Sequence, residues 1–248
     1  MALQEAKKII QESQNIYLIP EENQNPESIT SALALFYTLR NLGKNVNIII
    51  EELPEYLSFL IPSINFISYP KNFVISIPVK TANVSQIYYE KNDDALKIHL
   101  TVENGFIKKD DLSFYFSEKK PDLVVTFGIK DYHLQLSKKL NPFGFLLDAQ
   151  ILNIDSNQNA TAETDNKNFG KINLIGNDCP LAEIVLDLIN SFDADINKET
   201  ANCLLAGLII YTDNFKNFNV TAKVFETAAY LMKNGANLKE IINNIKRN

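Results

Sequence analysis

The strand–helix–strand pattern over residues 15–50 limits the fold of this chain more than any other stretch. Apolar runs at residues 16–19 and 46–50 are typical of short buried strands. The segment between them carries residues that favour the start and the end of a helix: Asn25 as N-cap, Pro26 at the first helical position, Glu27 in the first turn and Gly43 after the last turn. A strand, a helix and a strand in this order predict a right-handed parallel unit.

The same alternation returns in the second half of the chain. Buried strands are predicted at residues 122–127 and 151–155, and an edge or closing strand at residues 172–175. Helical periodicity marks the segments 2–14, a stretch with Leu134, Leu136 and Leu140, then 180–189, 198–211, 220–234, and a last helix capped by Asn237. We therefore predict an α/β fold with a doubly wound, mostly parallel sheet flanked by helices.

Residues from about 51 to 120 have a different character, because short strand patterns follow one another without helices. The predicted strands lie at residues 64–67, 73–79, 84–89, 96–102 and 113–116, with a hairpin turn at Asn92-Asp93-Asp94. His99 alternates with apolar neighbours and is expected on the solvated face of its strand. The chain is thus predicted to be one domain, 1–248, with a β-rich insertion at about 51–120.

Composition narrows the classes of function. The 248 residues are 46% hydrophobic and carry a net charge of −6, which argues against non-specific binding to nucleic acid, since that needs many cations. No stretch approaches the ~20 apolar residues of a membrane span, and residues 1–14 lack the apolar core of a signal peptide. Two cysteines, Cys179 and Cys203, are too few for a disulfide framework, and Cys203 is expected in the core. We expect a cytoplasmic protein without membrane contacts.

Ligands in parallel α/β proteins lie just beyond the carboxyl ends of the strands. Three predicted strands end near residues 20–25, at Gly128 and at Asp155, and the predicted helix 198–211 ends in the segment 211–215. These four places are expected to converge on one cleft. Asp155 is a candidate ligand for metal or phosphate chemistry; the alternative is that it only ends its strand and bonds nearby backbone.

An ordered set of sequence blocks resembles the DHH phosphoesterases, of the oligoribonuclease and phosphoadenosine-phosphate phosphatase type. Residues 21–35 (EENQNPESITSALAL) align without a gap with the family block HxNPDxDxxGSALAL. Further along, DLVVTFG (122–128) is similar to DLVIxLD, NIDSN (153–157) and NKNFGKINLI (166–175) to NIDHHxxNxxFGxINLV, LAEIV (181–185) to SxSEIV, and GLIIYTDNF (207–215) to GIxxDTxxF. The resemblance covers about residues 14–50 and 120–245. The family's smaller C-terminal substrate domain has no counterpart in this chain.

The resemblance implies a pair of Mn²⁺ ions held by His and Asp, but most of those positions differ here. Asp155 is the one ligand position that is retained. The residues that stand in place of the family's ligands are Glu21 for a His, Asn25 and Glu27 for two Asp, Gly128 for an Asp, Ser156 and Asn157 for two His, and Tyr211 for an Asp. Glycine supplies no ligand, tyrosine has a pKa near ~10, and Asn and Ser are neutral. Glu21, Glu27 and Asp155, with Asp213 if the backbone shifts, would be left to hold a single Mn²⁺ or Mg²⁺.

Two of these carboxylates have a structural alternative. Glu27 would compensate the positive end of a helix, and Glu21 would lie with Glu22 in a solvated loop.

Three functions follow from this pattern. The first is a catalytically impaired DHH-phosphoesterase-like protein that binds a nucleotide-like ligand or a protein partner. The alternative is an active metal-dependent phosphoesterase that hydrolyses short oligonucleotides or nucleotide phosphates through a rearranged or mononuclear site. The third is a purely structural subunit that pairs with an active paralogue. Possible partners are thus a small nucleotide or oligonucleotide, a second copy of the chain, or a paralogue.

Overall fold

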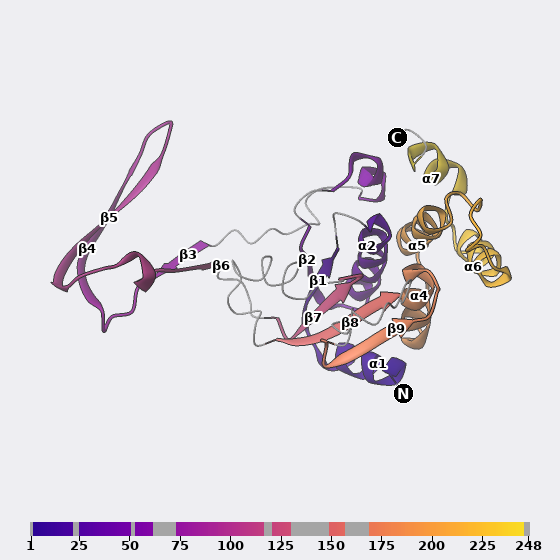
Figure 1. The fold of residues 1–248 in the computed structure, drawn as a ribbon, viewed down its shortest axis with the longest axis horizontal. Helices are drawn as coiled ribbons and strands as arrows, with labels where there is room; N and C mark the ends of the chain where they lie inside the picture. Colours follow the sequence, from indigo (N-terminus) through magenta and orange to yellow (C-terminus); the bar gives the residue numbers. More distant parts are fainter. Residues whose placement is uncertain are drawn as a thin grey trace. The chain divides into compact units, whose positions relative to one another are not determined.

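A computed structural model describes residues 2–21, 25–50, 53–61, 73–116, 121–129, 149–156 and 169–245. The chain divides into two compact units (Figure 1). Residues 73–116 belong to the smaller unit, and the other described residues belong to the larger one. Two predicted features lie outside the described residues: the strand at 64–67 and the helix with Leu134, Leu136 and Leu140.

The larger unit is built on a five-stranded parallel sheet. Its strands are β1 (Asn15–Pro20), β2 (Asn45–Ile48), β7 (Leu123–Phe127), β8 (Gln150–Ser156) and β9 (Ile172–Gly176). They lie in the order β2-β1-β7-β8-β9, and every neighbouring pair is parallel. All five residues of β7 are buried, as expected for a central strand covered on both faces. The predicted edge strand at 172–175 is confirmed as β9.

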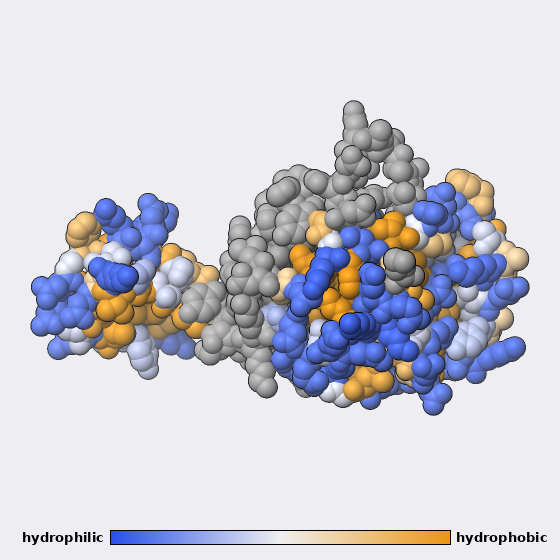
Figure 2. Space-filling view, turned by 90° about the horizontal axis from the view of Figure 1, so that it is seen from below, coloured by the Kyte–Doolittle hydropathy of each residue, from blue (hydrophilic) through white to orange (hydrophobic). Residues whose placement is uncertain are grey.

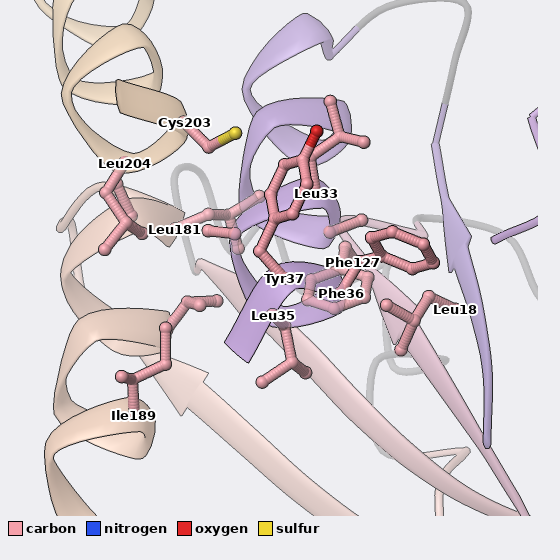
Figure 3. Packing of buried hydrophobic residues seen from close by; sticks show 14 of the residues in the cluster. Leu18, Leu33, Leu35, Phe36, Tyr37, Phe127, Leu181, Ile189, Cys203 and Leu204 are labelled. Carbon is pink, nitrogen blue, oxygen red and sulfur yellow. The ribbon is translucent and has the colours of Figure 1, made fainter. Parts of the chain in front are cut away.

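Helix α2 (Pro26–Asn41) is the centre of the hydrophobic core. Every residue from Glu27 to Leu39 is buried, so this helix is covered all round rather than along one stripe. Figure 3 shows why: Phe36 and Leu33 of α2 lie between sheet residues such as Leu18 and Phe127 and the helices that carry Leu181 and Leu204. Cys203 is fully buried in this cluster, as predicted.

The remaining helices of the larger unit are α1 (Ala2–Glu12), α4 (Leu181–Ser191), α5 (Lys198–Tyr211), α6 (Ala222–Lys233) and α7 (Leu238–Ile245), with a short 3₁₀ helix η1 (Glu55–Leu60). Helix α4 packs on β8 and β9 and beside α2, and α5 packs on α2 from the side away from the sheet (Figure 1). Within the described residues, no helix has the length and apolar character needed to cross a membrane.

Side-chain caps explain where several helices begin. Asn197 accepts a hydrogen bond from the N–H of Thr200 at 2.8 Å, and Asn237 accepts from Glu240 at 3.2 Å, which confirms the predicted cap of the last helix. The predicted capping bond of Asn25 is wrong. Asn25 stands at the N-cap of α2, but its side chain makes no capping hydrogen bond, because its amide lies against Gly128.

The smaller unit confirms a β-rich segment inside the predicted insertion. Strands β3 (Phe73–Ser76) and β6 (Ser113–Phe116) pair antiparallel, and β4 (Ala82–Lys91) pairs antiparallel with β5 (Leu96–Gly105). The turn between β4 and β5 is closed by Asn92, whose side chain accepts from the N–H groups of Asp94 and Ala95. His99 is partly exposed on β5, where its ring stacks on Tyr88 at 4.4 Å between centroids.

Candidate functional site

The strand order places a topological switch point between β1 and β7, because the chain continues from β1 to β2 on one side and from β7 to β8 on the other. Ligands of open parallel sheets bind in the crevice beyond such a point. Glu21 follows β1, and its N–H donates to the carbonyl of Phe127 at 3.0 Å. Gly128 follows β7 and donates to the carbonyl of Ile154 at 2.9 Å. The predicted convergence of the ends of β1, β7 and β8 is therefore observed.

Glu21 does not lie in a solvated loop, and that alternative is wrong. Its residue is 3% exposed, and its backbone carbonyl accepts a short hydrogen bond from the hydroxyl of Ser28. The same hydroxyl donates to the carbonyl of Asn25 at 2.7 Å. Ser28 thus links the end of β1 to the first turn of α2.

Gly128 is in close contact with the first turn of α2. Its φ of +63° lies in the left-handed region that favours glycine. A Cβ at this position would meet the side-chain nitrogen of Asn25 at 2.7 Å and Leu181 and Ser28 at 3.5 Å. The position at which the family resemblance implies a carboxylate therefore has no room for one in this arrangement.

Glu27 turns its carboxylate toward the start of α4 rather than toward solvent. One carboxyl oxygen accepts from the N–H of Ala182 at 3.2 Å, and the N–H of Leu181 also faces it. The residue is 4% exposed. The structural alternative placed this carboxyl at the start of a helix, and it is found there, but the helix is α4 and not its own helix α2.

Burial shifts Glu27 toward its neutral, protonated form. Desolvation raises the pKa of this carboxyl from 4.5 to about 8, against the lowering effect of the Ala182 and Leu181 N–H groups; the charges of Glu183 and Asp155 raise it further. At neutral pH the group is therefore mostly protonated. Glu27 therefore lies within electrostatic range of both Glu183 and Asp155.

Asp155 is the penultimate residue of β8, since pairing with β9 continues to Ser156. It is 4% exposed, and one of its carboxyl oxygens accepts from the N–H of Ser156 at 2.8 Å. The bond to nearby backbone was the structural alternative for this residue, and it is observed. Ser156 is 8% exposed, and Asn157 lies outside the described residues.

Glu183 is a buried acid of the site to which sequence reasoning gave no role. It lies in the first turn of α4 at 3% exposure, and its carboxylate pairs with the Lys223 ammonium of α6 at 3.1 Å. Partial desolvation lowers the pKa of Lys223, but the hydrogen bond and the charge of Glu183 outweigh it, so the net shift is upward. Burial, followed by the charge of Glu183, raises the pKa of the nearby Cys179 to about 11, which keeps that thiol protonated and unreactive.

Helix α5 approaches the site at Gly207. A Cβ there would meet the hydroxyl of Thr30 at 2.8 Å, Ala182 at 3.3 Å and the Glu27 side chain at 3.5 Å. Tyr211 lies one turn further along α5, and its carbonyl accepts from the Asn217 side chain at 2.8 Å. The turn that follows is left-handed at three successive residues, with φ between +46° and +62° from Asp213 to Phe215.

Glu21, Glu27 and Asp155 are the candidate ligands that the sequence leaves for a single Mn²⁺ or Mg²⁺. Within the described ranges, no group of three or more His, Cys, Asp or Glu side chains is placed to hold a metal ion. Glu21, Glu27 and Asp155 are all buried near one end of the sheet, but Glu27 is already bonded to α4 and mostly protonated. The residues present therefore do not match the donor set of a binuclear Mn²⁺ centre, which needs several anionic oxygens or imidazoles.

Comparison with known proteins identifies solved structures with a similar fold. No protein-family model matches the chain, and no curated protein does. Among solved structures, it is similar to an exopolyphosphatase-related protein from Bacteroides fragilis, with a TM-score of 0.69 and 15% identity over 100% of this chain and 60% of that chain. The chain shares that fold.

This likeness confirms the predicted fold class, a parallel α/β sheet flanked by helices. The exonuclease RecJ bound to manganese also matches, at a TM-score of 0.42 and 13% identity over 95% of this chain and 47% of that one. The chain spans about three-fifths of the length of the first of these proteins.

Proposed function

We propose that this chain is a DHH-phosphoesterase-like protein that acts by binding a ligand or a partner, not by metal-dependent hydrolysis. The observation that carries the proposal is the state of Glu27. A carboxyl that is buried and already accepts a hydrogen bond from the N–H of Ala182 at the start of α4 is less available to a hard divalent cation, which needs carboxylate oxygens as ligands. Gly128 beside it offers no side chain.

The charges of the site narrow the class of ligand. Glu21 and Asp155 are buried acids near the ends of β1 and β8, and the carboxylate of Glu183 is paired with Lys223. An anionic phosphate needs cationic or N–H donors. At the start of α4, the N–H of Ala182 already donates a hydrogen bond to the Glu27 carboxyl. The crevice therefore favours the hydrogen-bond donors of a nucleoside or of a protein partner over a phosphate group.

A second function, an active metal-dependent phosphoesterase, is favoured by one specific observation. The charges of Glu183 and Asp155 both raise the pKa of Glu27. A cation bound among them would displace the proton of Glu27, because metal binding and proton release are coupled. The similarity to an exopolyphosphatase-related fold is consistent with this alternative.

Hydrolysis assays with added Mn²⁺ distinguish the two functions. The substrates are dinucleotides, phosphoadenosine phosphate and a generic phosphodiester, and the matched variants are Asp155→Asn and the exposed control Glu226→Gln. Binding without catalysis predicts that wild type and Asp155→Asn give the same background rate. Turnover by wild type and Glu226→Gln that is lost in Asp155→Asn would establish the phosphoesterase.

A further inference from the structure

The β4–β5 ribbon of the smaller unit has one apolar face and one polar face. Its register sets Ile87 opposite Leu100 and Tyr89 opposite Ile98. Since side chains alternate between the faces of a strand, these four residues share a face. The opposite face carries Gln86, Tyr88, Glu90, Lys97, His99 and Thr101.

The β3–β6 ribbon supplies a second apolar surface. Ile75 lies opposite Phe114 in the register, and the ring of Phe73 stacks on that of Phe114 with centroids 6.2 Å apart. These side chains and the apolar face of β4–β5 line one groove of about 860 Å³. Figure 2 shows apolar residues gathered on this unit.

The groove is open to solvent in the single chain. Ile87 is 71% exposed, Leu96 60% and Phe73 52%. Among residues 73–114, whose side chains the structure describes, Ala82 alone is buried. Two-stranded ribbons are marginally stable in water unless a hydrophobic face is covered. We therefore expect another surface to pack against the apolar face of this unit.

The size of the open surface matches one half of a stable dimer. The exposed groove residues are Phe73, Ile75, Val79, Ile87, Leu96, Ile98 and Phe114, and their exposed fractions run from 38% to 81%. A fully covered aromatic side chain buries about 150–250 Å², so seven side chains that are on average roughly half exposed present on the order of 800 Å². That is the area that each partner contributes to a standard interface.

The chemistry of the groove favours a second copy over other occupants. Asn83 is the one polar residue among the described residues that line it, whereas sites for small ligands place several polar groups to orient them. Residues 73–116 carry five lysines and six acidic residues, so two such units do not repel each other. The rest of the chain is more acidic, since the whole carries −6.

We propose that a second copy of this chain covers the groove, in a two-fold dimer formed by the smaller units. The interface is isologous: the β4–β5 ribbon of each copy, with Ile87 and Leu96, packs into the groove of the other. This inference does not depend on the function proposed for the strand-end site, because no residue is common to the two.

Sedimentation velocity of the full chain over a concentration series tests the dimer. The matched variants are Ile87→Glu on the apolar face and Gln86→Glu on the polar face; both residues are exposed, so the single chain tolerates either charge. Wild type and Gln86→Glu are expected at twice 28.1 kDa, and Ile87→Glu at the mass of one chain. Amide exchange of wild type should slow between residues 84 and 102 as the concentration rises.

Three outcomes overturn the dimer. A wild type that stays monomeric throughout the concentration series excludes it. An Ile87→Glu protein that dimerises as wild type does places any dimer contact elsewhere. A monomeric wild type whose exchange between residues 84 and 102 is independent of concentration assigns the groove to another occupant. If Ile87→Glu fails to fold, the exchange series on wild type alone decides.

Discussion

At the scale of single residues, Glu27 joins fold and function. Its carboxyl accepts a hydrogen bond from the N–H of Ala182 at the start of α4, and burial raises its pKa to about 8. A buried acid of this kind leaves a signature in the pH dependence of stability. The folded chain holds the Glu27 proton more tightly than the unfolded chain, so stability is fully present below pH 4.5 and is lost as the pH rises through about 8.

We therefore predict that Glu27→Gln is more stable than wild type at alkaline pH. Glutamine keeps a carbonyl oxygen for the Ala182 N–H and cannot ionise. The gain in the free energy of unfolding should be near zero at pH 4.5 and rise to on the order of 1–3 kcal/mol above pH 8. Denaturant unfolding across this pH range measures it, with the exposed Glu226→Gln as control. Equal pH profiles for Glu27→Gln and wild type would show that Glu27 ionises normally in the folded chain.

At the scale of elements, the site depends on the close approach of α2, α4 and α5. Gly207 of α5 lies where these helices meet, and a Cβ there would fall 2.8 Å from the Thr30 hydroxyl. Glycine normally costs a helix roughly 1 kcal/mol relative to alanine. At position 207 we expect alanine to be less stable than glycine, because an added carbon in a packed core strains its neighbours.

We predict that Gly207→Ala lowers the free energy of unfolding by about 1–3 kcal/mol. Removing the hydroxyl that blocks the new methyl should restore part of the loss, so the double variant Thr30→Ala/Gly207→Ala should be more stable than the sum of the single effects predicts. Urea unfolding of the four proteins gives the coupling energy. Simple additivity would mean that Thr30 is not the group that Gly207 must avoid.

Sequence patterns located most elements but not the contacts between them. Residues 198–211 are α5, as predicted, because Asn197 caps a long apolar run. The convergence of the strand ends was also predictable, since parallel strands share an edge for their carboxyl ends. The pairing of Glu27 with Ala182 and of Glu183 with Lys223 was not, because these contacts depend on how α2, α4 and α6 pack. Glu183 follows the apolar Ala182 of α4, and nothing local marks it as buried.

At the scale of the whole molecule, each of the two units carries one proposed binding surface. The larger unit places buried acids at the switch point of its parallel sheet, where we propose that a ligand or partner binds. The smaller unit presents an apolar groove suited to a second copy. The two parts are testable separately, since no substitution proposed for one lies in the other.

The central claim is that the strand-end site holds no binuclear Mn²⁺ centre at neutral pH. Titrating the full chain with Mn²⁺ and recording the electron paramagnetic resonance signal of the free ion tests it most directly, because bound Mn²⁺ loses that signal. The account predicts that the signal grows in proportion to added Mn²⁺ and equally for wild type, Glu27→Gln and Asp155→Asn. Stoichiometric loss of signal in wild type that is abolished by Asp155→Asn would contradict it.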